Sequence, residues 1–355
     1  MADPRIIKLA KILTDYSLKI SKGDRIRICF DSDASELALE CYKNILKKGA
    51  YPIAHASMPG FGYAYYKNAS SEQLKNYPAL TEHEVKNSQG MISIGGEYNT
   101  KEMSSISPKK ISARRKTTSK ISDFITDQNN WVGVEFPTNA LAQDAEMSLE
   151  EFETFVYSAT NVNWAEESKK QDNLKKILDK GKKVRIIGKN TNLSFSIAGR
   201  TAIKCDGKRN MPDGEVFIAP VENSTEGTIE YSFPAIYNGK EVSGIKLKFK
   251  KGRVIEASAE KNDGFLKEML NTDKGAKHLG EFGIGVNFGI KRFVKQILFD
   301  EKIGGTVHLA LGRAYKEGGG RNESAIHWDM IKDLRKEGKV MVDGKTIIEK
   351  GKFFF

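Results

Sequence analysis

Short apolar runs alternate with amphipathic segments through the first 136 residues, and this alternation is the strongest constraint on how the chain can fold. Four runs have the length and composition of buried strands: "RIRICF" (25–30), "YPIAHA" (51–56), "MISIGG" (91–96) and "WVGVEF" (131–136). Between the first two, "ELALECYKNILKKG" carries apolar residues at positions 37, 38, 41, 45 and 46 on one helical face and stops at Gly49. Strands separated by helices predict βαβ units and a mainly parallel sheet.

The pattern changes after a polar helical segment that ends at Gly181. Beyond it, "NLSFSI" (192–197) alternates apolar and polar residues as a half-buried strand does. Three dipeptides typical of tight turns lie between strand-like runs: Asn238-Gly239, Lys251-Gly252 and Asp343-Gly344. These signals predict β-hairpins, which join antiparallel strands.

Two helical patterns interrupt this β-rich half, "DGFLKEML" (263–270) and "FGIKRFVKQILF" (288–299). We therefore expect an α/β domain with a mainly parallel sheet over residues 1–181. An α+β domain rich in antiparallel strands is expected to follow over residues 182–355.

Composition indicates a globular protein in a reducing compartment. With 39% hydrophobic and 29% charged residues in 355, the chain can bury a core, and no apolar run is long enough to cross a membrane. The three cysteines, Cys29, Cys41 and Cys205, lie far apart and form no CxxC pair. This spacing argues against disulfides and against a thiolate zinc site, and it favours the cytoplasm. Any metal would need His, Asp and Glu as ligands.

The net charge of +11 raises the alternative of a nucleic-acid-binding protein. However, the lysines are spread along the whole chain. The densest cluster, "SPKKISARRKTTSK" (107–120), has no aromatic residue on which a base could stack. A solvated basic helix is the better interpretation, and we predict neither a nucleic-acid partner nor a membrane partner.

Several polar side chains stand where the second half's strand patterns call for apolar residues: Glu215, Glu281, His308, Tyr315, His327 and Asp329. Residues two apart in a strand point to the same face, so His327 and Asp329 project together while Trp328 points into packing. Each residue alone has a structural explanation, since buried histidines and tyrosines are commonly hydrogen-bonded core residues.

Together, two imidazoles and three carboxylates without a cysteine suit Zn²⁺, Co²⁺ or Mn²⁺. Buried carboxylates without partners destabilise a fold, and a pair of cations removes that penalty. We therefore expect a site for two divalent ions in the C-terminal domain.

Four blocks carry a family resemblance, in order from Asn210 to Ile331: "NMPDGEVFIAP", "HLGEFGIGVN", "DEKIGGTVHLALGRAY" and "GGGRNESAIHWDMI". They resemble the metalloaminopeptidases typified by the thermophilic aminopeptidase T. The resemblance implies a homodimeric, PepS-like enzyme that removes N-terminal amino acids from peptides by means of metal-activated water. It implies two ions held by Glu215, Glu281, His308, His327 and Asp329, with Glu281 as the bridge and Tyr315 beside them.

On this hypothesis Glu281 and Tyr315 are catalytic, with Tyr315 donating to the tetrahedral intermediate. Glu226 is a candidate to hold the substrate's free amine, and no general base is identifiable. A two-metal phosphoesterase remains an alternative. It needs further cationic groups for phosphate, for which "GGGR" (318–321) is the best candidate.

Overall fold

The computed structural model describes residues 3–128, 130–237 and 239–355. The chain forms two compact units. The first unit contains the described residues up to Asn161 together with Gly207–Pro212, and the second contains Val162–Asp206 and Asp213–Phe355. The predicted boundary at Gly181 falls inside the second unit, because helix α9 (Trp164–Lys180) packs against strands of that unit.

The first unit is built on a five-stranded parallel sheet in the order β2-β1-β3-β4-β8. Its strands are β1 (Arg25–Asp31), β2 (Tyr51–Ser57), β3 (Gly90–Gly95), β4 (Asn130–Glu135) and β8 (Asn210–Met211). Alternate residues of the central strands, such as Ile92 and Ile94, are buried as a sheet between helices requires. The predicted parallel sheet is confirmed.

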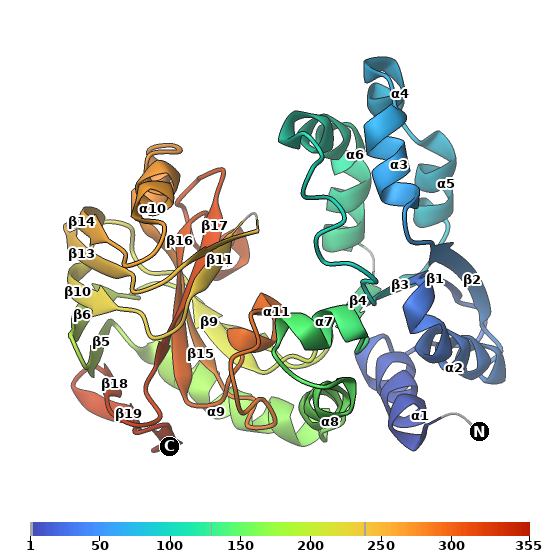
Figure 1. Ribbon diagram of the computed structural model, residues 1–355. Coiled ribbons are helices and arrows are strands. Elements are labelled where there is room, and N and C mark those ends of the chain that lie inside the picture. The colour runs from blue at the N-terminus through green and yellow to red at the C-terminus, as the bar shows by residue number, and fades with distance from the viewer. Residues whose placement is uncertain (1–2, 129, 238) are drawn as a thin grey trace. The chain divides into compact units, whose positions relative to one another are not determined.

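The helices of the first unit are α1 (Pro4–Lys11), α2 (Ser35–Lys47), α3 (Phe61–Asn68), α4 (Ser71–Lys75), α5 (Ala79–Lys86), α6 (Pro108–Gln128), α7 (Asn139–Asp144) and α8 (Leu149–Thr160). Helix α2 packs on β1 and β2 and lies beside α1 (Figure 1). Its residues Leu37, Cys41 and Ile45 are buried as predicted, but Leu46 is 53% exposed. Within the described residues, no helix is both long enough and apolar enough to cross a membrane.

Three carboxylates gather at the carboxyl ends of the parallel strands. Asp31 ends β1, Glu97 follows β3 and Glu135 ends β4. Burial, followed by the charges of Glu97 and Asp31, raises the pKa of Glu135 to about 7. An unfolded glutamate titrates near its ordinary pKa of about 4.3. The protonated side chain therefore contributes stability that is complete below that pKa and is lost as the pH rises through 7.

We expect Glu135→Gln to remove this pH dependence. At pH 8 the variant's free energy of unfolding should exceed that of the wild type by on the order of 3 kcal/mol, because each unit of the pKa difference costs about 1.4 kcal/mol and the variant forms no buried charge. Near pH 4 the two proteins should be equal. Urea unfolding from pH 4 to pH 8 measures the difference, with the exposed Glu150→Gln as control. A Glu135→Gln protein less stable than the wild type at pH 8 would contradict this account.

The second unit contains two larger antiparallel sheets and a small one. The eight-stranded sheet, in the order β14-β13-β10-β6-β5-β18-β19-β20, contains β5 (Lys183–Gly188), β6 (Thr191–Ser196), β10 (Glu226–Glu230), β13 (Lys246–Lys250), β14 (Arg253–Ser258), β18 (Lys339–Val342), β19 (Lys345–Glu349) and β20 (Lys352–Phe353). The five-stranded sheet, in the order β17-β16-β15-β9-β7, contains β7 (Ile203–Cys205), β9 (Glu215–Ile218), β15 (Leu279–Gly285), β16 (Thr306–Gly312) and β17 (His327–Asp333). The predicted α+β unit rich in antiparallel strands is confirmed.

Two of the three predicted hairpins are confirmed. Lys250 pairs with Arg253 across Lys251-Gly252, and Val342 pairs with Lys345 across Asp343-Gly344. At the third, β11 (Ala235–Tyr237) pairs antiparallel with β12 (Lys240–Val242), while Asn238 of the predicted turn lies outside the described residues.

The two larger sheets share one core. Phe195 of β6 and Phe282 of β15 are both buried, and their ring centroids lie 5.1 Å apart in an edge-to-face contact. Because side chains alternate along a strand, the neighbours of Phe282 must point to the opposite face of the five-stranded sheet. That face is therefore available for polar side chains.

The helix predicted over residues 288–299 is wrong: α11 covers only Ile297–Asp300, whereas α10 (Asp263–Leu270) is confirmed. The buried carboxylate of Asp300 accepts a hydrogen bond of 2.7 Å from the backbone N–H of Val294, which fixes a loop. Lys295 has a φ of 64°, which no right-handed helix allows. The loop also places Phe293 on Phe233, with ring centroids 4.9 Å apart. These tertiary contacts override the helical pattern.

Candidate metal centre

Four adjacent strands of the five-stranded sheet carry the predicted ligands. Figure 1 shows β15, β16 and β17 side by side, and β9 pairs with β15 on the side opposite β16. The core side chains of these strands, such as Leu309 and Trp328, are fully buried in the hydrophobic core of this unit. The residues between them share the opposite face: Glu215 on β9, Glu281 on β15, His308 on β16, and His327 with Asp329 on β17. Strand alternation thus assembles the set.

The five side chains form one continuous cluster. His308 Nε2 lies 3.0 Å from Glu215 Oε2 and 3.1 Å from Glu281 Oε1. His327 Nε2 lies 3.7 Å from Glu281 Oε2 and 3.5 Å from Asp329 Oδ2. The residues come from segments far apart in the sequence, and the fold brings all five together.

A backbone contact orients His327. Its Nδ1 lies 2.7 Å from the carbonyl oxygen of Arg313, so this nitrogen donates a hydrogen bond to that carbonyl. The other nitrogen, Nε2, then carries the free lone pair and faces Glu281 and Asp329. Metal-binding histidines are typically held in this way.

The cluster has more acceptors than donors. The single Nε2–H of His308 cannot point at both Glu215 and Glu281. Among the described residues, Glu215 Oε2, Glu281 Oε2 and Asp329 Oδ1 have no hydrogen-bond partner, although all three atoms are buried. Unpartnered buried oxygens destabilise a fold, and a divalent cation satisfies them directly. The donor set therefore fits a metal.

Two further residues that the sequence did not single out belong to the cluster, Glu301 and Lys302. Ligand atoms of Glu301, His308 and Asp329 lie within 4.8 Å of one another, as do those of Glu215, Glu281 and His308. Lys302 is fully buried; its Nζ contacts Glu301 and lies 3.5 Å from Glu215 Oε1. The charged triplet Asp300-Glu301-Lys302, directly before an apolar strand, is the signal that could have found them.

Lys302 offsets only part of the negative charge of the cluster. Within the described residues, four carboxylates belong to it: Glu215, Glu281, Glu301 and Asp329. Burial raises the pKa of Glu215, but Lys302 and His308 outweigh burial and hold that pKa at about 2. Burial also raises the pKa of Glu301 to about 8, in spite of Lys302. Burial opposes a charged His308, yet Glu215 and Glu281 raise its pKa well above the usual value. Without a metal the cluster retains protons, and a metal must displace them on binding.

Tyr315 lies beside the cluster. Its ring centroid is 5.1 Å from that of His327 and 5.5 Å from that of Phe217, and the residue is 44% exposed. Burial of the hydroxyl, followed by the charges of Glu281 and Asp329, raises the pKa of Tyr315. The phenol therefore stays protonated and can donate a hydrogen bond.

Glu226 is not brought to the cluster. It lies on β10 of the eight-stranded sheet, where its exposed Oε1 accepts a hydrogen bond of 2.8 Å from the backbone N–H of Lys251. The carboxylate supports the β13–β14 turn, and its assignment to the substrate's amine stays a prediction from the sequence.

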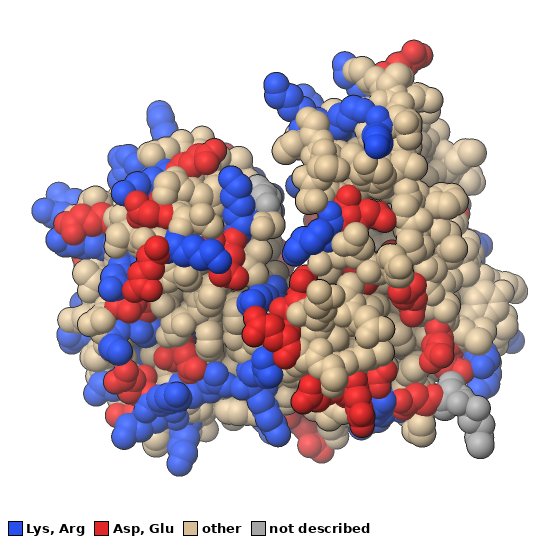
Figure 2. All heavy atoms as spheres, viewed as in Figure 1, with Lys and Arg blue, Asp and Glu red and all other residues tan. Residues whose placement is uncertain are grey.

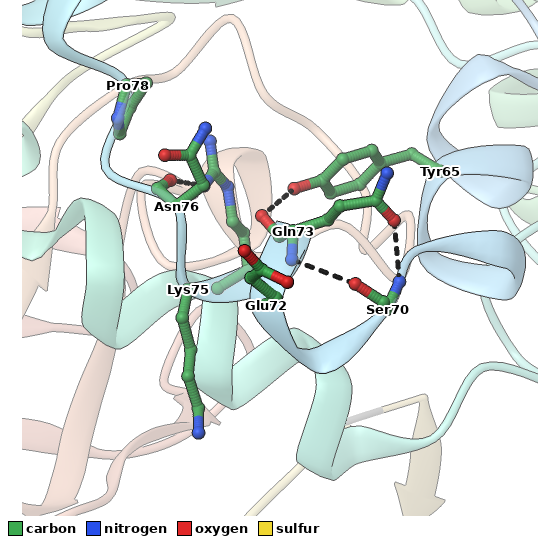
Figure 3. Close-up of a pocket in the computed structure, with 8 residues that line it drawn as sticks. Tyr65, Ser70, Glu72, Gln73, Lys75, Asn76 and Pro78 are labelled. Atoms are coloured by element: carbon green, nitrogen blue, oxygen red, sulfur yellow. Dashed lines mark hydrogen bonds between the residues drawn. The ribbon is translucent and has the colours of Figure 1, made fainter.

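The basic run 107–120 has a structural role in the first unit. Lys110 Nζ on α6 lies 2.7 Å from the carbonyl oxygen of Tyr66 and also donates to the two nearby carbonyls of Lys67 and Ala69. Arg114 donates to the carbonyl of Asn76 at 2.6 Å. Asn76, labelled in Figure 3, lines an open recess of about 1120 Å³ that Arg114 also borders. On the face that Figure 2 shows, basic and acidic side chains are intermingled.

Residues 2–353 match the family described as thermophilic metalloprotease (M29). The chain belongs to this family. It is 25% identical to aminopeptidase 2 of Geobacillus stearothermophilus over 95% of this chain and 94% of that one. It is 33% identical to aminopeptidase T of Thermus aquaticus over 40% of this chain and 37% of that one. The resemblance seen in the sequence blocks is confirmed.

Solved structures confirm the fold of this M29 protein. AmpT from Thermus thermophilus superposes with a TM-score of 0.86 at 22% identity, covering 99% of both chains. A 2,5-dihydroxypyridine dioxygenase from Pseudomonas putida has a TM-score of 0.60 at 11% identity. Because that protein is named for a different reaction, the fold alone does not fix the chemistry. Family membership does fix the class, a metal-dependent peptide hydrolase, in preference to a phosphoesterase.

Proposed function

We propose that this M29 protein is an aminopeptidase with a site for two divalent ions, Zn²⁺, Co²⁺ or Mn²⁺. The observation that carries the proposal is the buried cluster of carboxylate oxygens without partners, set around two histidines. The names of the relatives, aminopeptidases among them, supply the reaction. The homodimer and the cytoplasmic location stay predictions from the sequence.

The proposed ligands are Glu215, Glu281, His308, His327, Asp329 and, added from the structure, Glu301. Glu281 suits the bridging position because its two oxygens face different histidines: Oε1 is 3.1 Å from His308 and Oε2 is 3.7 Å from His327. Nitrogen and oxygen donors without sulfur match the preferences of Zn²⁺, Co²⁺ and Mn²⁺. Lys302 would balance the charge of Glu215 and Glu301, which leaves a net acidic site for the cations.

A bound divalent ion supplies a nucleophile, because it lowers the pKa of water from 15.7 to roughly 7, and it polarises the peptide carbonyl. The chain's own residues supply the rest. Tyr315 keeps its proton and can donate to the oxygen on which negative charge develops. The Arg313 carbonyl holds the His327 ring in one tautomer. The apolar side chains packed on the other face of these strands help to hold the ligand side chains in fixed rotamers.

Metal removal tests the proposal. Dialysis against a chelator should abolish release of nitroaniline from leucine nitroanilide, and Zn²⁺, Co²⁺ or Mn²⁺ should restore it, because the buried carboxylates need a cation to act. N-acetyl-leucine nitroanilide, which has no free amine, should be cleaved at least roughly 100-fold more slowly, as expected of a site that binds the amine in the transition state. Chelator-resistant activity, or equal rates on both substrates, contradicts the proposal.

A further inference from the structure

The face of the five-stranded sheet that carries the proposed metal ligands also carries an aromatic residue, Phe217. It lies two residues after Glu215 on β9, so the two side chains project from the same face. Val216 and Ile218, which point the other way, are fully buried in the hydrophobic core. Phe217 is only half-buried. An aromatic ring therefore stands beside the ligands with part of its surface uncovered.

The register of the strands places Phe217 directly against the cluster. Phe217 pairs with Gly283 of β15, and Gly283 pairs with His308 of β16, so the three residues form one row across the sheet. Gly283 has no side chain, and a Cβ added there would lie 2.0 Å from His308 Nε2. The imidazole therefore extends over Gly283, and Phe217 is the next side chain in the row.

Two further residues continue the apolar surface around Phe217. Ile203 of β7 pairs with Phe217 on the side opposite Gly283 and is half-buried. The ring centroid of Tyr315 lies 5.5 Å from that of Phe217 and 5.1 Å from that of His327. We call Ile203, Phe217 and Tyr315 the apolar wall. It borders the cluster and reaches the solvent at Tyr315, which is 44% exposed.

The chemistry of an aminopeptidase substrate defines what such a wall can contact. The enzyme must hold the free amine and the carbonyl of the scissile bond, and the Cα that joins them carries the side chain of the N-terminal residue. That side chain therefore lies directly beside the cluster. An apolar side chain gains stability by leaving water for the wall. A charged one would lose its hydration without gaining a partner from these three residues.

We propose that Phe217 determines specificity for the N-terminal residue of the substrate. Its ring, supported by Ile203 and Tyr315, receives the side chain of that residue and favours a bulky apolar group over a small one. The inference rests on the proposed aminopeptidase function and adds to it a residue that touches neither the amine nor the scissile bond.

The test compares leucine nitroanilide with alanine nitroanilide, whose side chains differ by three carbon atoms. The wild type should favour the leucine substrate in kcat/KM by roughly tenfold or more, as expected for partial burial of those carbons. Phe217→Ala should reduce this ratio to about threefold or less, and Phe217→Leu should keep most of it, because leucine preserves much of the apolar surface. If Phe217 only supported the ligands, Phe217→Ala would lower both rates in proportion and leave the ratio unchanged.

Phe288→Ala is the matched control. Phe288 is also a partly exposed phenylalanine of the second unit, but its ring contacts Phe353 instead of Tyr315. The Phe288→Ala protein should keep the wild-type ratio of the two substrates.

Binding of the products gives a measurement that does not depend on turnover. Calorimetric titration should show L-leucine binding more tightly than L-alanine by roughly fivefold or more in the wild type, and with nearly equal affinity in Phe217→Ala. Crystals of the wild type soaked in L-leucine need no variant, and they should show the isobutyl group in contact with the Phe217 ring.

The outcomes separate the two proposals. A wild type that cleaves neither nitroanilide would overturn the proposed function and this inference with it. A wild type that cleaves both substrates equally well, a Phe217→Ala protein that keeps the leucine preference, or an isobutyl group bound away from Phe217 would overturn the inference alone.

Discussion

Glu281→Gln should lower kcat/KM for leucine nitroanilide by well over 100-fold. Loss of a residue that only supports a metal ligand costs up to about 100-fold, and loss of a direct ligand should cost more. The reason is geometric. The two oxygens of Glu281 face His308 and His327, so this carboxylate is the link between the two halves of the cluster. A carboxamide keeps the shape but loses the negative charge and one of the two acceptors. Steady-state kinetics at saturating Zn²⁺ or Co²⁺ measure the loss.

The metal content of Glu281→Gln distinguishes a lost ligand from a lost fold. We expect fewer bound ions per chain by elemental analysis, with an unfolding transition that stays cooperative. Glu40→Gln is the matched control, because Glu40 is also buried but pairs with Lys43 in the first unit, whereas the cluster belongs to the second unit. It should retain wild-type kcat/KM within about twofold, because Glu40 shares no partner with the cluster residues. Full activity and full metal content in Glu281→Gln would remove Glu281 from the site.

Sequence periodicity predicted much of this fold because local and tertiary preferences agree. The parallel sheet follows from apolar runs such as "RIRICF", which are buried on both faces only in a sheet that is covered by helices. Where tertiary contacts oppose the local pattern, the sequence misleads. Residues 288–299 have helical periodicity, but the buried carboxylate of Asp300 binds the Val294 N–H and imposes a loop.

The candidate ligands were predictable for a different reason. A histidine or carboxylate within an apolar strand is conspicuous, and His327 and Asp329 are two apart, so they share a face whatever the fold. Glu301 and Lys302 were missed because they precede a strand, where charged residues are ordinary. Glu226 was only a candidate without a motif of its own, and the structure places its strand in the other sheet.

Gly283→Ala should be strongly disruptive, although it adds only a single methyl group near the site. Gly283 lies opposite His308 across β15 and β16, and an added Cβ would lie 2.0 Å from His308 Nε2. The imidazole is fully buried and cannot move aside freely. We expect the free energy of unfolding to fall by about 2–4 kcal/mol and peptidase activity to fall with it, since His308 must leave its position between the carboxylates. Urea unfolding and leucine nitroanilide kinetics provide the measurements.

The double variant Gly283→Ala/His308→Ala separates the steric clash from the loss of a ligand. Removing the imidazole makes room for the new methyl group, so the second substitution should restore stability relative to Gly283→Ala while activity stays absent. The second substitution would then raise the free energy of unfolding without restoring activity. This combination is expected only if the imidazole ring and the added Cβ compete for the same space. Gly264→Ala is the control, because its Cβ would meet nothing within 4 Å on α10, and it should be neutral or slightly stabilising. Additive stability losses in the double variant would show that His308 does not occupy the space above Gly283.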